Sequence, residues 1–330
     1  MNAQNQNKLP FEPKSIFSIS NEDEFNEKAL QLFHYQLKHN YVYSAYCKHI
    51  KTEVAAVDHY TKIPFLPISF FKTHMVSSFK GDAAITFSSS GTTGRTISKH
   101  HVKDTALYES SFIKGFEHDY GPIQDYLVLG LLPSYLEREG SSLIYMVDRF
   151  IKESKHPDSG FFLDEYDELA AILKKNECEK ILLIGVTYAL LDFGEKYSPQ
   201  LSQGIIMETG GMKGRRKEMI KEELHAVLKE QFSTPIIHSE YGMTELLSQA
   251  YSAGLNFKCP PWMKVLIRSY SDPFELIDHK TGGINVIDLA NIHSCAFIAT
   301  QDLGRTNNET FEVVGRFDNS DIRGCNLLIQ

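Results

Sequence analysis

Hydrophobic and polar positions in the first part of the chain indicate one long helix followed by irregular structure. Apolar residues recur at helical spacing over residues 22–51, as at Phe25 and Leu32, which predicts a helix with one buried face. The residues before this helix, to about residue 20, predict a loose N-terminal arm. Two prolines in the segment 63–74, IPFLPISFFKTH, would break any helix there.

Short apolar runs in the middle of the chain are typical of buried strands. The run over residues 126–132 (YLVLGLL) is continuously apolar and ends at Pro133. A continuous apolar run is typical of a strand that is buried on both faces in a parallel sheet. Helical patterns over residues 163–175 and 217–231 alternate with such runs. This alternation predicts a largely parallel sheet covered by helices on both faces. The other runs that we assign to strands are 85–90, 180–186, 204–208 and one that starts at 235–238.

The pattern changes near residue 260, where the helical periodicity ends. Short apolar segments separated by Gly and Asp turns follow, and each of them predicts a strand. We therefore predict an α/β fold in a single domain over residues 1–330, with a smaller β-rich subdomain from about residue 260 to residue 330. The segments assigned to strands in this part are 265–270, 274–278, 282–290 and 311–316.

Composition and charge exclude several classes of protein. The chain of 330 residues is 42% hydrophobic and 23% charged, which is ordinary for a folded domain and not for a disordered one. Its net charge of -8 argues against a nucleic-acid-binding protein. The longest apolar stretch, 181–193, is shorter than the roughly 20 residues of a membrane span. We expect a cytoplasmic protein with free thiols, since no signal core and no CxxC pair is present.

A segment rich in hydroxyls and glycines, SSSGTTGRT over residues 88–96, is the first candidate for chemistry. Its six hydroxyls and two glycines suit phosphate binding, because glycines let the backbone approach an anion and hydroxyls add donors. Arg95 adds a fixed cationic fork. The segment does not fit the GxxxxGK[ST] pattern, and a plain Ser/Thr turn is the alternative.

Three further segments carry candidate ligand-binding residues. The first, EYGMTE over residues 240–245, follows a predicted strand, and ligands of α/β sheets bind at the carboxyl ends of strands. Its Thr244 is a candidate for hydrogen bonding to a phosphate, and Glu245 is a candidate Mg²⁺ ligand. The other two are TQDLGR over residues 300–305 and GRFD over residues 315–318, and an Asp such as Asp302 after a strand can bind ribose hydroxyls. Each segment taken alone is also a common turn.

Taken together and in this order, the four segments resemble the motifs of the adenylate-forming enzymes, the acyl-CoA synthetase and luciferase superfamily. SSSGTTG is similar to the phosphate loop of that superfamily, YGMTE to its aromatic-Gly-x-Thr-Glu motif, TQD to its T-G-D motif, and GRFDNSDIRG to its G-R-x-D hinge. The segment ETGGM, 208–212, lies where the superfamily has a Gly-rich turn beside the adenine. The resemblance covers residues 85–325. It departs from the family at Gln301, where Gly is usual, and at the missing Pro-Lys pair after the phosphate loop.

The resemblance implies a role for each matching residue and implies ATP and Mg²⁺ as cofactors. Tyr241 would pack near the adenine, Asp302 would bind the ribose, and Arg316 would face the ribose or a phosphate. Thr244 would contact the α-phosphate and Glu245 would bind the Mg²⁺. The remaining nucleotide-binding residues implied by the resemblance are Ser90, Thr92, Thr93, Gly94 and Gly211, with Arg95 in place of the missing lysine.

The end of the sequence resembles one branch of this superfamily, the acyl-protein synthetases (LuxE type) of bacterial fatty-acid reductase systems. Most superfamily members continue into a mobile C-terminal lid, which we expect to be absent here. PFLPISFFKTH and the terminal DIRGCNLL are similar to the short branch. In that branch a cysteine near the C-terminus accepts the acyl group, and Cys325 fits this place.

The function expected from these residues is ATP-dependent activation of a carboxylic acid, in particular a fatty acid, and transfer of its acyl group to a protein cysteine. An acyl reductase, an acyltransferase or an acyl carrier protein would be the partner. Two alternatives remain open at this point. One is a ligase that transfers the acyl group to coenzyme A or a carrier-protein thiol, and the other is a non-catalytic nucleotide-binding scaffold.

Overall fold

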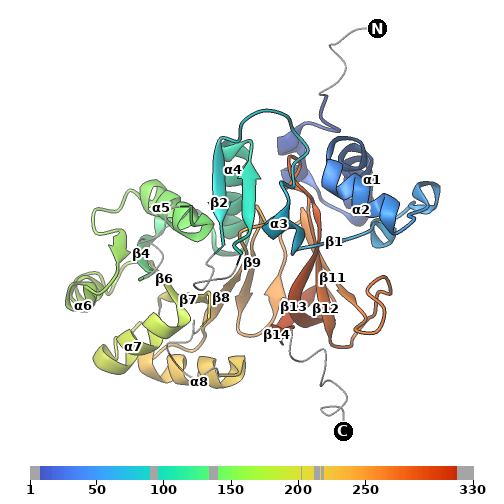
Figure 1. Ribbon diagram of the computed structural model, residues 1–330. Helices are drawn as coiled ribbons and strands as arrows, with labels where there is room; N and C mark the ends of the chain where they lie inside the picture. Colours follow the sequence, from blue (N-terminus) through green and yellow to red (C-terminus); the bar gives the residue numbers. More distant parts are fainter. Residues whose placement is uncertain are drawn as a thin grey trace. The chain divides into compact units, whose positions relative to one another are not determined.

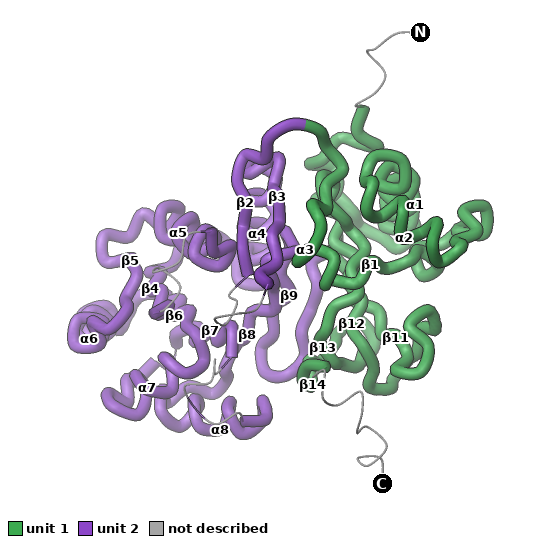
Figure 2. The backbone as a smooth tube through the Cα atoms, in the orientation of Figure 1, with its two compact units in different colours: residues 1–80, 261–330 green, residues 81–260 purple. Residues whose placement is uncertain are grey.

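The computed structural model describes residues 8–89, 96–133, 140–201, 203–211, 216 and 219–317. The chain divides into two compact units (Figure 2), one made of residues 1–80 and 261–330 and the other of residues 81–260. The sequence predicted one domain with a β-rich part from about residue 260. The first 80 residues belong to the same unit as that part, which the local sequence pattern did not indicate.

Unit 1 begins with packed helical structure rather than with a loose arm. The 3₁₀-helix η2 (Pro13–Ser18) buries Ile16 completely, and the rings of Phe17 and Trp262 lie 4.8 Å apart in an edge-to-face contact. The expectation of a loose arm is therefore wrong for this segment. The predicted long helix is two helices, α1 (Glu22–His39) and α2 (Tyr41–His49). It divides at Asn40, whose side chain accepts a hydrogen bond from the backbone N–H of Tyr43 and so caps α2.

The sheet of unit 1 consists of antiparallel neighbours in the order β11, β12, β13, β14, with the short β1 parallel to β13. Arg268 of β11 links three strands. Its guanidinium donates to the backbone carbonyls of Ile284 in β12 and Thr300 in β13 at 2.7 and 2.6 Å. The predicted strand at 274–278 is absent, and only an isolated bridge joins Leu276 to Arg268. The bounds are β1 (Leu66–Pro67), β11 (Met263–Arg268), β12 (Gly282–Asp288), β13 (Phe297–Asn307) and β14 (Thr310–Arg316), with η3 (Val54–Ala56), η4 (Tyr60–Lys62) and α3 (Phe70–Thr73) before them.

Unit 2 contains the predicted parallel sheet. Strands β8, β7, β6, β4 and β5 are parallel neighbours in that order, and β9 and β10 continue the sheet beyond β8 as antiparallel strands. Strand β6 is buried along its whole length, which explains its unbroken apolar sequence. The bounds are β4 (Leu127–Leu131), β5 (Gly160–Phe162), β6 (Ile181–Val186), β7 (Ile205–Thr209), β8 (His238–Tyr241), β9 (Ala250–Ala253) and β10 (Phe257–Lys258).

Helices cover both faces of this sheet. Helices α4 and α5 pack on each other on one face, and α7 and α8 pack on each other on the opposite face (Figure 1). A separate antiparallel hairpin, β2 and β3, lies beside α4. The bounds are β2 (Ile85–Ser88), β3 (Lys99–Val102), α4 (Thr105–Tyr120), η5 (Ile123–Asp125), α5 (Ser142–Ser154), α6 (Tyr166–Lys175), α7 (Thr187–Tyr197) and α8 (Lys221–Phe232). Within the described ranges, none of the helices has the length and apolar character that a membrane crossing needs.

Candidate functional site

The Ser/Thr/Gly segment connects the two strands of the β2–β3 hairpin. Residues 90–95 lie outside the described residues, and with them lie the predicted site residues Ser90, Thr92, Thr93, Gly94 and Arg95. Two hydrogen bonds between Ser89 and Ser98 close the base of the loop. The backbone N–H of Ser89 donates to the carbonyl of Ser98 at 3.1 Å, and the N–H of Ser98 donates to Ser89 Oγ at 2.9 Å.

A buried histidine joins this hairpin to the Thr-Glu turn. His100 of β3 is 1% exposed, and its Nδ1 lies 2.8 Å from the backbone carbonyl of Thr244. Because a carbonyl only accepts hydrogen bonds, Nδ1 carries the proton in this pair. The hairpin that carries the hydroxyl-rich loop is thereby fixed to the turn that carries Thr244 and Glu245. His100 and Thr244 lie 144 residues apart in the sequence and are neighbours in the structure.

The carboxyl ends of β7 and β8 carry the next group of predicted residues. Gly210 and Gly211 follow β7 with φ of 76° and 71°, a backbone conformation that other residues rarely adopt. Tyr241 is the last residue of β8 and is 8% exposed, with its ring 5.8 Å from that of Phe257. Glu245 is 5% exposed. Their positions at strand ends agree with the usual place of ligands in α/β sheets.

Behind the strand ends, on the side of α8, lies a buried ionic cluster that the sequence did not reveal. Glu208 of β7 lies 3.2 Å from Lys221 Nζ and 3.8 Å from His225 Nε2. Thr187 donates a hydrogen bond to it at 3.1 Å. Burial alone would raise the pKa of Glu208, but the neighbouring His225 imidazole and the positive charge of Lys221 outweigh it and lower the pKa to about 2.

Glu240, one residue before Tyr241, has the opposite electrostatic environment. Its Oε2 accepts a 2.6 Å hydrogen bond from the Thr209 hydroxyl. Burial raises the pKa of Glu240 to about 7, and the negative charge of Glu208 adds to this effect, whereas Thr209 and Lys221 act against it. A carboxyl group that titrates near neutrality beside a predicted ligand site is a candidate functional residue.

The predicted ribose residues are in unit 1. The sequence placed Asp302 just after a strand, but it lies within β13, directly opposite Arg316 on β14. This expectation is wrong because β12 and β14 pair with β13 on both sides and extend it through the polar TQD segment. Asp302 is 8% exposed, and its Oδ1 lies 3.0 Å from Arg316 Nε. Cys325 lies outside the described residues.

The residues present suit a Mg²⁺ ion that is bound together with phosphates. The described part of the chain holds no group of three or more His, Cys, Asp or Glu side chains that could coordinate a metal. Mg²⁺ in nucleotide sites is commonly held by one or two carboxylates plus phosphate oxygens and water. The single buried carboxylate of Glu245 fits that arrangement, and a metal centre built from protein ligands alone does not.

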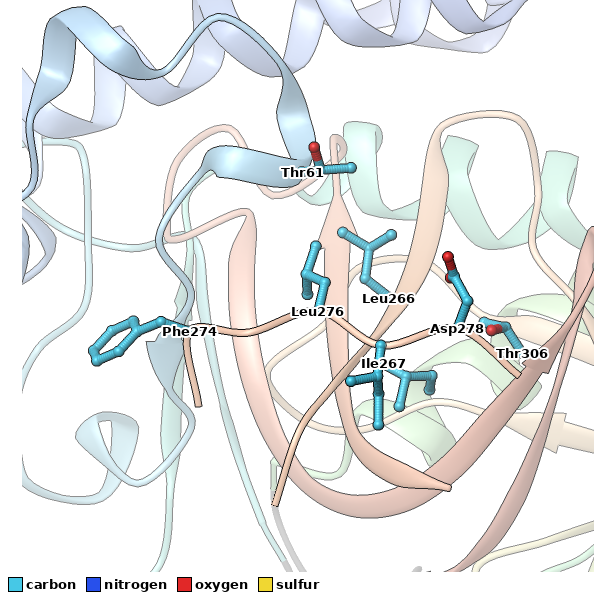
Figure 3. Close-up of a pocket in the computed structure, with 8 residues that line it drawn as sticks. Thr61, Leu266, Ile267, Phe274, Leu276, Asp278 and Thr306 are labelled. Atoms are coloured by element: carbon cyan, nitrogen blue, oxygen red, sulfur yellow. The ribbon is translucent and has the colours of Figure 1, made fainter. Parts of the chain in front are cut away.

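One cavity of unit 1 is unrelated to the predicted residues. It has a volume of about 360 Å³ and lies between β11 and the loop that follows it, with Leu266, Leu276 and Asp278 among its lining residues (Figure 3). Phe274 at its edge is 63% exposed. None of the residues that the sequence analysis selected lines this cavity.

Comparison with known proteins identifies the fold. No protein family defined by sequence and no curated protein matches this chain. The structure is similar to that of 2-hydroxyisobutyryl-CoA ligase in complex with 2-HIB-AMP and CoA, with a TM-score of 0.65 at 10% identity over 90% of this chain and 70% of the ligase. It is also similar to ATP-bound MatB from Rhodopseudomonas palustris, with a TM-score of 0.52 at 15% identity over 72% of this chain and 49% of MatB. The predicted fold class is confirmed: the chain has the α/β fold of the large N-terminal domain of adenylate-forming enzymes. This likeness is one of fold, and it carries no information on the acyl-protein synthetase type.

Proposed function

We propose that this protein activates a carboxylic acid with ATP as an acyl-adenylate and then transfers the acyl group to a thiol. The observation that carries the proposal is the 2.8 Å contact between His100 and the Thr244 carbonyl. It brings the hairpin of the hydroxyl-rich loop against the Thr-Glu turn within a fold that adenylate-forming ligases share. The solved relatives bound to 2-HIB-AMP or to ATP support the same chemistry.

In the first step a carboxylate oxygen attacks the α-phosphorus of ATP, an acyl–phosphate bond forms, and pyrophosphate leaves. No proton moves in this step, so catalysis consists of positioning and charge stabilisation. The proposed roles follow from residue chemistry. Thr92, Thr93 and Arg95 would bind phosphates and Thr244 would donate to the α-phosphate. Glu245 would hold a Mg²⁺ ion, which would neutralise phosphate charge. Asp302 binds the ribose, as the resemblance implies.

In the second step a thiolate attacks the acyl carbon, a C–S bond forms, and AMP leaves. We propose Cys325 as this nucleophile, with a fatty acid as the substrate. The preceding Arg323 and Gly324 support the assignment, since a neighbouring cation favours the thiolate. A thiol tethered to the same chain also has a high effective concentration. Coenzyme A or a carrier-protein thiol is the second candidate acceptor, and the CoA bound to the 2-hydroxyisobutyryl-CoA ligase favours it.

Carboxylate-dependent exchange of labelled pyrophosphate into ATP tests the first step. We expect exchange with wild-type protein, and a loss of about 10²-fold or more in Glu245→Gln, the scale for removing one transition-state contact. Glu223→Gln, the same change at an exposed position of α8, is the matched control and should exchange like wild type. A wild-type protein that binds ATP but exchanges no pyrophosphate with any acid would support the nucleotide-binding scaffold instead.

A further inference from the structure

Two polar side chains meet beside Gly242, at the carboxyl end of β8, and none of the roles assigned above uses them. A Cβ atom at position 242 would lie 2.2 Å from Glu240 Oε1 and 3.2 Å from Gln249 Cγ. Only glycine therefore leaves room for both side chains in this arrangement. Gln249 precedes β9, the strand that pairs with β8, so the two side chains come from neighbouring strands.

The second observation is that polar atoms in this place lack partners. Gln249 is 5% exposed, and its Oε1 has no hydrogen-bond partner among the described residues. The hydroxyl of Tyr251, which lies directly opposite Glu240 in the β8–β9 register, is also buried without a partner there. Most buried polar groups are hydrogen-bonded, so these two atoms are available to a ligand or a water molecule.

The chemistry of these atoms defines what they can bind. Glu240 Oε2 is occupied by the Thr209 hydroxyl, which leaves Oε1 as an acceptor, and Gln249 Oε1 is a second acceptor. Tyr251 is packed against the rings of Phe116 and Tyr120 of α4 at 6.0 and 5.6 Å, so aromatic rings surround this residue opposite Glu240. A group that fits here is a hydrogen-bond donor: an amino group can donate to both acceptors, and a hydroxyl can donate to one of them.

We propose that Glu240 and Gln249 form a recognition pair for an amino or hydroxyl group of a bound ligand. The proposal rests on the proposed function for its two candidate ligands. One is ATP, whose adenine carries an exocyclic amine, and the other is a carboxylic acid that carries an amino or hydroxyl substituent. The second case would make the substrate a polar acid rather than a plain fatty acid.

The experiment is a double-mutant-type cycle: it removes the Glu240 or Gln249 side chain from the protein and the amino or hydroxyl group from the ligand, separately and together. Calorimetry measures binding of ATP and of purine riboside triphosphate, which lacks the 6-amino group, to the full chain. A second arm compares butyric acid with 3-hydroxybutyric and 4-aminobutyric acid, by binding and by pyrophosphate exchange. Each arm uses wild type, Glu240→Ala, Gln249→Leu and the control Glu230→Ala, an exposed glutamate of α8. Gln249→Leu replaces a buried amide by an apolar side chain of similar size, so it tests the pair even if Glu240→Ala fails to fold.

We expect removal of the donor group from the ligand to weaken binding about fivefold or more in wild type and in Glu230→Ala, the scale of one lost hydrogen bond. In Glu240→Ala and in Gln249→Leu the same removal should weaken binding by a clearly smaller factor than in wild type, because one of the two partners is gone. Such coupling in the nucleotide arm assigns the pair to adenine, and coupling in the acid arm assigns it to the acid.

Equal losses in wild type and both variants, in both arms, would overturn the proposal. If wild-type protein still exchanges pyrophosphate in that case, the proposed function stands without the recognition pair. If wild type binds nucleotide but exchanges nothing, the function fails while the nucleotide arm still decides the recognition pair. A wild-type chain that binds neither ligand overturns both.

Discussion

Replacing His100 tests the link between the hydroxyl-rich loop and the Thr-Glu turn. His100 is 1% exposed and donates from Nδ1 to the Thr244 carbonyl at 2.8 Å. Alanine removes this donor and leaves a carbonyl without its partner, which costs about 1–3 kcal/mol. Since 1.4 kcal/mol corresponds to a factor of ten, kcat/KM for ATP in pyrophosphate exchange should fall by about 5- to 150-fold if the turn must be held in place.

Two further variants separate this effect from general damage. His100→Asn retains a donor near the position of Nδ1, so its kcat/KM for ATP should stay within about threefold of wild type, well under the cost of a lost hydrogen bond. His101→Ala is the matched control, because His101 bonds to Thr86 within the hairpin at 2.9 Å and not to the turn. Thermal unfolding of each variant shows whether it is folded at the assay temperature. A folded His100→Ala protein with wild-type exchange would refute the reasoning.

Three other predictions follow from separate parts of the chain. Cys325→Ser should lose the hydroxylamine-labile label from a radiolabelled acid with ATP while pyrophosphate exchange continues; full labelling of this variant would show that another thiol is the acceptor. Asp302→Ala should raise KM for ATP about tenfold, because a carboxylate that binds ribose hydroxyls is lost, and an unchanged KM would remove Asp302 from the site. The pKa of Glu208 is lowered from its ordinary value of 4.5 to about 2, so its contribution to stability is present above pH 4.5 and is lost as the pH falls toward 2. Denaturant unfolding between pH 6 and pH 2 should show this loss in wild type and a flatter profile in Glu208→Gln.

Strands and helices with a simple burial pattern were predictable from the sequence. Strand β6 is buried on both faces and reads as a continuous apolar run. Helix α7 directly follows it and was missed, because most of its first eight residues are buried as well and the apolar run gives no sign of a change in period. The extent of strand β13 was missed for a different reason, since polar residues such as Gln301 alternate with buried ones along it and pairing with two neighbours sets its length.

The candidate site was predictable only as a set of loops. Motif order suggested that the hydroxyl-rich segment and the Thr-Glu turn belong to one site. The structure shows a contact of His100 with Thr244, and the site itself stays a prediction. The order of motifs gave no reason to select His100, Glu240 or Gln249, because the role of each depends on a partner in another segment of the chain. The difference between the low pKa of Glu208 and the raised pKa of Glu240 likewise depends on Lys221 and His225 of α8. Residue spacing in the sequence does not indicate that these two side chains lie beside β7 and β8.

Transfer of an oxygen atom from the acid to AMP tests the proposed activation most directly. When a carboxylic acid labelled with ¹⁸O in both oxygens attacks the α-phosphorus, one labelled oxygen becomes part of the acyl-adenylate and remains with AMP after the thiol attacks the acyl carbon. Mass spectrometry of AMP formed by wild-type protein with ATP, Mg²⁺, the labelled acid and a thiol should therefore show one ¹⁸O atom per AMP. AMP without the label, or ADP as the product, would contradict activation through an acyl-adenylate.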